Sequence, residues 1–292
     1  MIIDFHTHTF PDKIASRAID KLSHDAHIIP HRDGTVSSLV TSSKDADVDI
    51  SVILPVATSP EQVININDSA TRINEEYSVD HCANKEPGRL LSFAAIHPDL
   101  SEYKNELRRI KELGFKGIKI HPVYQKKDID DISFLRIINC AAELDLIVVT
   151  HAGIDIGFLD ETQSSPEKCK HVWDEIGQFK FVLAHMGGWK NWDEAKELFA
   201  RSGVYIDTAF STDKMTPLPD GYWKESDLCF LDAQGFTDMV NAFGEDKVLF
   251  GTDSPWSGQK ESLDFIRALS LSDETKSKIF GKNAAGLLGL TD

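Results

Sequence analysis

The sequence predicts an α/β protein folded as a single (β/α)8 barrel, also called a TIM barrel. Apolar, β-branched runs that indicate strands alternate with amphipathic segments about eight times along the chain. No glycine-rich phosphate-binding turn follows an early strand, which disfavours the competing open doubly wound sheet. The chain has 292 residues and no shift in composition, so we expect one domain over residues 1–292 with additional C-terminal helices.

The strands are expected where Ile, Val, Leu and Phe gather in short runs. Eight such runs span residues 1–8, 49–55, 90–98, 116–122, 146–153, 179–188, 204–208 and 247–253. The fifth is apolar and β-branched nearly throughout, as is typical of a strand covered on both faces.

Helical periodicity is found between these runs. The expected helices span residues 12–22, 60–84, 101–113, 132–144, 165–177, 193–201 and 236–243, followed by 259–269 and 273–288. Ser101 is expected to cap the third of them, and Gly114 to end it. Two polar stretches, about 24–47 and 208–233, are predicted to be long loops at the pocket entrance, and the first is a candidate lid.

Composition narrows the class of protein. The net charge of −16 disfavours nucleic acid and anionic membranes as partners. No apolar run is long enough to span a membrane, and the first strand begins at Met1, so no signal peptide is expected. Cys82, Cys140, Cys169 and Cys229 are scattered, which favours reduced thiols in a cytoplasmic protein that acts on a small molecule.

Histidines gather at the C-terminal ends of the predicted strands. Six of the eleven lie there: His6, His8, His97, His121, His151 and His185. In a barrel these strand ends meet at one mouth, where active sites are built. The pattern therefore predicts a metal centre, although the His97-Pro98 step has the simpler reading of a strand terminator.

We expect His6, His8, His151 and Asp253 to hold the metal. His6 and His8 lie two residues apart on a strand and so project from one face. Three imidazoles and a carboxylate suit Zn²⁺ or Mn²⁺. Asp253 would ligate the metal, accept a proton from bound water, or both. The structural alternatives are a core histidine bonded to backbone for His151, and a turn aspartate for Asp253.

Other polar and aromatic residues follow later strands. His185 precedes two glycines and is the candidate general acid or electrophile. Lys119 and His121 share one face of the fourth strand, where they would bind substrate or form a buried structural pair. His121 is also a candidate ligand of a second metal. Trp189 and Trp256 are candidate pocket walls.

These motifs resemble the amidohydrolase superfamily, in the amidohydrolase-related branch that includes aminocarboxymuconate-semialdehyde decarboxylase and the resorcylate decarboxylases. The resemblance runs from residue 3 to 290 and rests on segments 6–8, 117–122, 183–188, 251–255 and 282–290, together with His151. It implies a divalent metal on His6, His8, His151 and Asp253, with His185 beside the bound water.

Two features qualify the resemblance. The decarboxylases bind the substrate carboxylate with an arginine after the second strand, and residues 55–60 contain none. Family members with two metals bridge them through a carboxylated lysine of the fourth strand, an option that Lys119 keeps open. We expect one metal.

The leading functional hypothesis is a metal-dependent hydrolase in which a metal-bound water attacks a small amide, lactone or ester. The second is non-oxidative decarboxylation of a small aromatic or unsaturated carboxylic acid. The third is a metal-stabilised ligand-binding barrel without turnover. A metal-dependent deoxyribonuclease is disfavoured by the acidic charge. The substrate and the oligomeric state stay open; a homodimer is compatible with the sequence.

Overall fold

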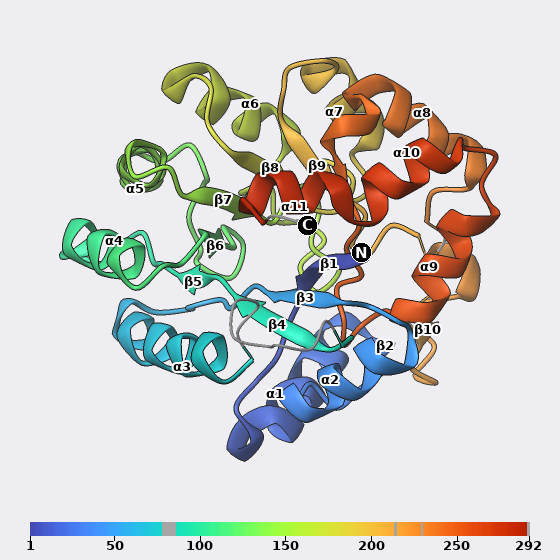
Figure 1. Ribbon diagram of the computed structural model, residues 1–292, viewed down its shortest axis with the longest axis horizontal. Coiled ribbons are helices and arrows are strands. Elements are labelled where there is room, and N and C mark those ends of the chain that lie inside the picture. Colours follow the sequence, from blue (N-terminus) through green and yellow to red (C-terminus); the bar gives the residue numbers. More distant parts are fainter. Residues whose placement is uncertain (78–85, 213–214, 229, 291–292) are drawn as a thin grey trace.

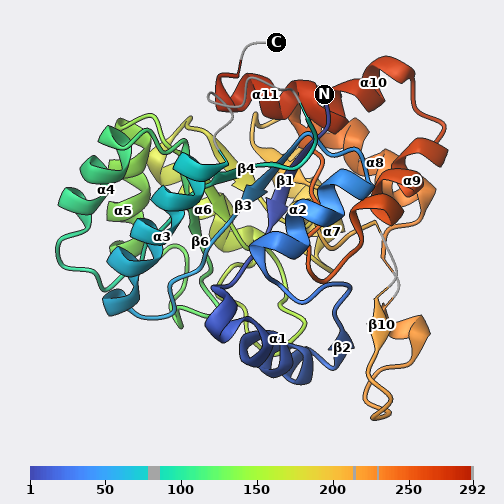
Figure 2. The ribbon, with the colours of Figure 1, turned by 60° about the horizontal axis from the view of Figure 1, so that its bottom comes forward.

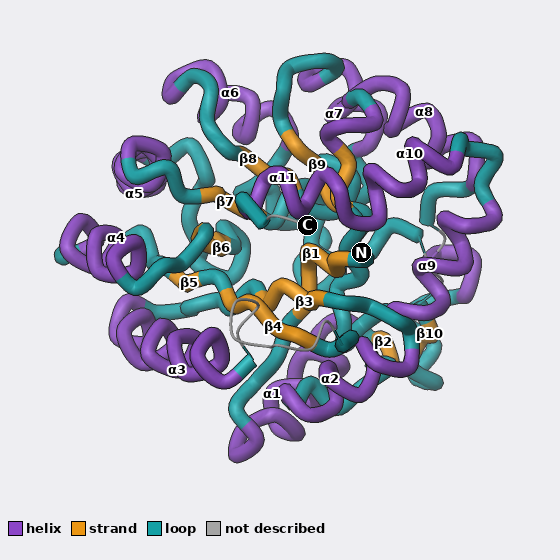
Figure 3. The backbone as a smooth tube through the Cα atoms, in the orientation of Figure 1, coloured by secondary structure: helices purple, strands orange, loops and turns teal. Residues whose placement is uncertain are grey.

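The structure is a computed structural model that describes residues 1–77, 86–212, 215–228 and 230–290. Its strands form a ring surrounded by helices (Figures 1 and 3). Parallel pairing joins β1 (Ile3–Thr7), β3 (Ile50–Ile53) and β4 (Arg89–Ser92). A second parallel sheet runs through β5 (Ala94–Ala95), β6 (Gly117–Ile120), β7 (Ile147–Thr150), β8 (Phe181–Leu183), β9 (Tyr205–Asp207) and β11 (Val248–Leu249).

Backbone hydrogen bonds join these two sheets into a barrel. Only Phe93 separates β4 from β5, which together form the third predicted strand. On the other side, the Phe5 amide donates to the Phe250 carbonyl at 2.7 Å, and the Asp253 amide donates to the His6 carbonyl at 2.8 Å. These contacts place the segment after β11 beside β1, so the predicted TIM barrel is confirmed.

The helices cover the outside of the ring. They are α1 (Asp12–Ala26), α3 (Val63–Glu76), α4 (Tyr103–Glu112), α5 (Ile132–Glu143), α6 (Pro166–Ile176), α7 (Trp192–Phe199), α8 (Ala233–Phe243) and α9 (Gln259–Ala268). At the C-terminal end, α10 (Asp273–Ser277) continues through a π-helical turn (Lys278–Lys282) into α11 (Asn283–Leu288). Buried residues of α11 pack with Ile3 and Phe5 of β1, so α11 covers the N-terminal end of the barrel (Figure 1).

The prediction that residues 24–47 form a long loop is wrong. It contains the end of α1, β2 (Ile28–Ile29) and α2 (Val36–Asp45). Thr35 caps α2 by accepting a hydrogen bond from the Ser38 amide at 3.2 Å. The serines that make this segment look like a loop are partly buried; the Ser43 hydroxyl contacts the Leu39 carbonyl and the Ser51 hydroxyl, each at 2.9 Å. Hydrogen-bonded hydroxyl groups therefore occupy buried positions on this helix face that apolar side chains usually fill.

The second predicted loop also contains regular structure. β10 (Thr216–Pro217) pairs antiparallel with β2, and a 3-10 turn spans Glu225–Leu228. The two segments predicted as loops thus form a ribbon with each other, next to α1 (Figure 2).

Two predicted helix boundaries differ from those in the structure. Glu102, not Ser101, occupies the N-cap position of α4. The helix predicted over 60–84 begins as a 3-10 turn at Pro60–Gln62, and residues 78–84 lie outside the described residues.

Cys140 in α5 and Cys169 in α6 are free thiols; Cys82 and Cys229 lie outside the described residues. None of the described helices is long and apolar enough to cross a membrane.

Candidate active site

A cavity of about 200 Å³ opens among the C-terminal strand ends. Its polar lining comprises His6, His8, Lys119, His121, Tyr124, His151, Asp155, His185 and Asp253, with Thr9 and Thr58. Apolar side chains form the rest: Phe10, Leu22, Ala26, Ile28, Leu54, Pro55, Val56, Ile154, Ile156, Trp189, Phe210 and Trp256. Every site residue predicted from the sequence lines this cavity, which combines a titratable group of side chains with apolar walls.

Of the six strand-end histidines, His97 is the one that does not line the pocket. Its Nδ1 accepts a hydrogen bond from the Asp99 amide at 3.2 Å, and the side chain is buried. The His97-Pro98 step therefore ends a strand, the simpler of its two readings.

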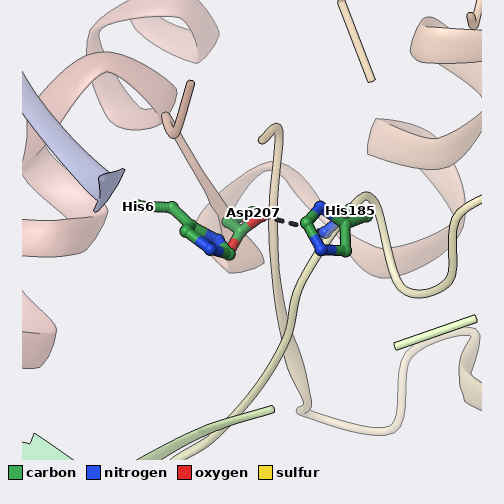
Figure 4. A group of neighbouring side chains, drawn as sticks. All are labelled: His6, His185 and Asp207. Atoms are coloured by element: carbon green, nitrogen blue, oxygen red, sulfur yellow. Dashed lines mark hydrogen bonds and ion pairs between the residues drawn. The ribbon is translucent and has the colours of Figure 1, made fainter. Parts of the chain in front are cut away.

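His6 is held by a carboxylate that the sequence analysis did not single out. Its Nδ1 lies 2.8 Å from Asp207 Oδ2, and both side chains are fully buried. Asp207 Oδ1 in turn accepts from the backbone amides of His185 and Ala209 at 3.0 and 3.1 Å. Asp207 thus lies between His6 and His185 (Figure 4). The carboxylate fixes the proton of His6 on Nδ1 and leaves the Nε2 lone pair directed into the site.

The signal for Asp207 was present in the sequence. It is an acidic residue at the C-terminal end of a predicted apolar strand, the same pattern that identified Asp253. Burial raises the pKa of Asp207 to about 6, although the charges of His185 and Lys119 oppose the shift.

His8 presents the same tautomer as His6. Its Nδ1 lies 2.8 Å from the Leu54 carbonyl oxygen, which can only accept, so Nδ1 carries the proton and Nε2 has the lone pair. This Nε2 lies 3.1 Å from His6 Nε2 and 3.0 Å from Asp253 Oδ1. His6 Nε2 is 3.5 Å from the same carboxylate oxygen.

Three acceptor atoms therefore face one another at the end of β1. Two imidazole lone pairs and a carboxylate repel each other unless a cation lies among them. Their donor atoms and spacing fit a divalent metal.

His151 supplies a fourth candidate ligand, oriented through His185. His185 Nδ1 lies 3.1 Å from the Ala209 carbonyl oxygen and donates to it, so His185 Nε2 is an acceptor. His151 Nδ1, at 3.0 Å, donates to this Nε2. The remaining His151 Nε2 therefore has a lone pair, and it is buried without a hydrogen-bond partner in the described structure. A buried lone pair without a partner, on a residue that lines the pocket, is the arrangement expected of a metal ligand.

Lys119 lies beside this centre. The ammonium nitrogen is 3.4 Å from His6 Nε2, and the side chain is almost fully buried. Burial lowers the pKa of Lys119 to about 8, while the charges of Asp207 and Asp253 act in the opposite direction. Among the lining residues that the structure describes, Lys119 is the one lysine or arginine.

A buried network ties β1 to the Asp253 segment. The Asp4 carboxylate accepts from the Thr252 amide and hydroxyl at 3.1 and 2.6 Å, and from the Gln259 side-chain amide at 2.8 Å. Asp4 therefore fixes the segment that carries Asp253 against the strand that carries His6, which holds their distance.

A second group lies after β6 and β7. His121 stacks on His151 with ring centroids 4.3 Å apart and an interplanar angle of 16°. His121 Nε2 is 3.5 Å from Asp155 Oδ2, and Asp155 Oδ1 accepts from the Gly157 amide at 2.8 Å. Burial raises the pKa of Asp155 to about 6. The sequence placed His121 in the site but missed Asp155, which lies in the loop after β7 and not at a strand end.

Comparison with known proteins places this geometry in a family. The family model described as amidohydrolase matches residues 3–290. No curated protein sequence matches the chain. Several solved structures resemble it over nearly its whole length.

A 2,6-dihydroxybenzoate decarboxylase in complex with 2,6-dihydroxybenzoate is 16% identical, with 99% of each chain covered and a TM-score of 0.68. The dihydroxybenzoic acid decarboxylase of Polaromonas sp. JS666, with bound manganese and 2-nitroresorcinol, is 14% identical, with 99% of this chain and 96% of that chain covered and a TM-score of 0.67. The probable 2-pyrone-4,6-dicarboxylic acid hydrolase of Acinetobacter baumannii, with citric acid bound, is 16% identical, with 99% of each chain covered and a TM-score of 0.64.

At these identities the solved structures show the fold, and the family match covers almost every residue of the barrel. This chain belongs to the amidohydrolase family.

Proposed function

We propose that this protein is a metal-dependent hydrolase of a small amide, lactone or ester, with one divalent metal held by His6, His8, His151 and Asp253. The observation that carries the proposal is the set of facing acceptors, His6 Nε2, His8 Nε2 and Asp253 Oδ1, which lie 3.0 to 3.5 Å apart at the pocket floor. Three nitrogens and one carboxylate suit Zn²⁺, and Mn²⁺ is also compatible.

When bound, a divalent cation lowers the pKa of water and polarises a carbonyl group. Asp253 is the residue placed to take the proton of the attacking water, because its carboxylate lines the pocket with Oδ1 3.0 Å from His8 Nε2. The same carboxylate then delivers this proton to the leaving nitrogen or oxygen. Asp253 thus takes one proton from water and passes it to the leaving group, so the enzyme returns to its starting protonation state.

His185 is better suited to positioning than to the general-acid role expected from the sequence. Its Nδ1–H is engaged by the Ala209 carbonyl and its Nε2 accepts from His151. Burial also lowers the pKa of His185 to about 4, so the ring is neutral near pH 7. A neutral ring in this orientation orients His151, and its one N–H proton is already donated to the Ala209 carbonyl.

Decarboxylation of a small carboxylic acid is the second candidate. Lys119, the buried cation of the pocket, can pair with one substrate carboxylate. Two of the similar structures are dihydroxybenzoate decarboxylases, and the third is a probable hydrolase. The absence of arginine at 55–60 separates this chain from the carboxylate-binding pattern expected of the decarboxylase branch, and favours the hydrolase.

The deciding experiment starts with elemental mass spectrometry of the protein as purified and after metal reconstitution. About one zinc or manganese per chain is expected. The metal-loaded protein is then assayed by pH-stat against lactones, esters and amides, and by carbon dioxide release against aromatic and unsaturated acids. Asp253→Asn measures the background. Carbon dioxide release would establish the second candidate, and the absence of metal and of turnover in every class would refute both.

A further inference from the structure

The group after β6 and β7 has a polar pair that the proposed metal centre does not use. His121 and Asp155 are 7% and 5% exposed and both line the pocket. Two long contacts agree on the tautomer of His121: the Tyr124 backbone amide, which can only donate, lies 3.5 Å from Nδ1, and Asp155 Oδ2, which accepts, lies 3.5 Å from Nε2. A neutral ring with its proton on Nε2 satisfies both. This Nε2–H faces Asp155 Oδ2, the oxygen that the Gly157 amide does not engage.

The contact between the two side chains is too long for a good hydrogen bond. The Nε2 to Oδ2 distance is 3.5 Å, whereas N–H···O bonds are typically about 2.7–3.2 Å. The Nε2–H of His121 and Oδ2 of Asp155 therefore lie side by side on the pocket lining without a good hydrogen bond between them. A ligand that bonds to both atoms would supply the partner that each lacks in the pair.

A metal does not fit this pair well. An imidazole lone pair lies in the plane of its ring, and the His121 and His151 planes are nearly parallel and stacked. Two stacked planes do not meet at a common position for a metal ion. In this tautomer His121 would also have to lose its Nε2 proton before that nitrogen could bind a metal.

A hydroxyl group fits the pair because it both accepts and donates. Its oxygen would accept from His121 Nε2–H, and its hydrogen would bond to Asp155 Oδ2. We propose that His121 and Asp155 form a subsite that recognises a hydroxyl group of the substrate, remote from the reacting group at the metal. The apolar walls of the cavity, which include Trp189 and Phe210, suit an apolar or aromatic body between the two polar ends.

This inference rests on the proposed function, since it assumes that the reacting group lies at the His6, His8 and Asp253 centre. The probes are matched acids that differ in one hydroxyl: benzoate with the three hydroxybenzoates, and cyclohexanecarboxylate with its 3- and 4-hydroxy derivatives. Their affinities for the metal-loaded protein are measured by calorimetry. At least one hydroxylated probe is expected to bind about tenfold tighter than its parent.

His121→Phe is the informative variant, because a phenyl ring preserves the stack on His151 and removes the N–H donor. It should reduce the ratio of the affinity of the hydroxylated probe to that of its parent acid to about one. It should leave the metal content unchanged. His97→Gln is the matched control, since it changes a buried strand-end histidine that lies outside the pocket; its preference should match that of the unmodified protein.

Three results would overturn the inference: no hydroxylated probe that binds tighter than its parent, a preference that survives in His121→Phe, or loss of metal in that variant, which would make the pair a metal site. A different result tests the proposed function. If metal binds and the hydroxyl preference holds but no ester, lactone or amide is hydrolysed, the hydrolase proposal fails and the subsite stands.

Discussion

Two trios of the same composition line one pocket with all their members; a third, His6, His185 and Asp207, shares His6 with the first. His6, His8 and Asp253 form the first trio, at β1 and after β11; His121, His151 and Asp155 form the second, after β6 and β7. In the first, each histidine has its Nδ1 bonded outward, to Asp207 or to the Leu54 carbonyl, so both Nε2 lone pairs point inward. In the second, the two rings stack and only His151 keeps a free lone pair.

The difference shows that the hydrogen-bond partner of one ring nitrogen decides whether the other nitrogen has a lone pair for a metal. Proximity brings both trios within reach of a cation, but ligation needs lone pairs that converge in the ring planes. The first trio meets that condition, and His151 of the second trio, with its free lone pair, is the fourth ligand that we propose. The remaining members of the second trio, His121 and Asp155, form a donor–acceptor pair.

The largest effect is expected from the first trio. His6→Ala/His8→Ala should lower metal content from about one per chain to near zero and reduce turnover to background, because two of four ligands are removed. Elemental mass spectrometry is the measurement. His97→Gln is the matched control, since this strand-end histidine lies outside the pocket, and it should retain its metal. Equal metal loss in both variants would contradict the assignment.

A smaller effect is expected when the proton-accepting carboxylate of the first trio is neutralised. Asp253→Asn should lower kcat on a hydrolysed substrate by about 10²–10⁴-fold, because the amide accepts no proton. Steady-state kinetics at saturating metal separates this loss from weaker metal binding. A kcat within threefold of the unmodified enzyme would rule out Asp253 as the base.

The orienting carboxylate comes next. Asp207→Asn should weaken metal binding about 10–100-fold, because the amide no longer favours the proton on His6 Nδ1. Competition with a chelator measures the affinity. The analogous change in the second trio, Asp155→Asn, should leave metal affinity unaltered, and equal losses in both variants would remove the distinction between the trios.

The smallest effect concerns Lys119, whose charge acts on histidines of both trios. Its pKa is about 8 in the fold and 10.5 in the unfolded chain, so the unfolded state binds the proton more tightly. The resulting destabilisation is complete below pH 8 and is relieved as the pH rises from about 8 to 10.5. Lys119→Met should therefore stabilise the metal-free protein by about 2 kcal/mol at pH 7.

Urea unfolding of the metal-free protein at pH 7, 9 and 10 measures this difference. The gap in unfolding free energy between Lys119→Met and the unmodified protein should narrow as the pH rises. A gap that is constant with pH would show that Lys119 does not titrate in this range.

Much of this molecule follows from local sequence pattern. Alternating apolar runs and amphipathic segments predicted the barrel, because strand and helix periods are properties of neighbouring residues. The position of His6, His8, His151, His185 and Asp253 at strand ends predicted a shared site, because parallel strands bring their C-terminal ends together.

The tertiary structure decided what depends on contacts between distant residues. It paired the segment after α1 with β10, which neither polar sequence shows alone. It set each histidine tautomer through a partner far along the chain, such as Asp207, 201 residues from His6. It also separated two trios of equal composition, because ring orientation depends on packing across the barrel and is not encoded in the local spacing of histidines.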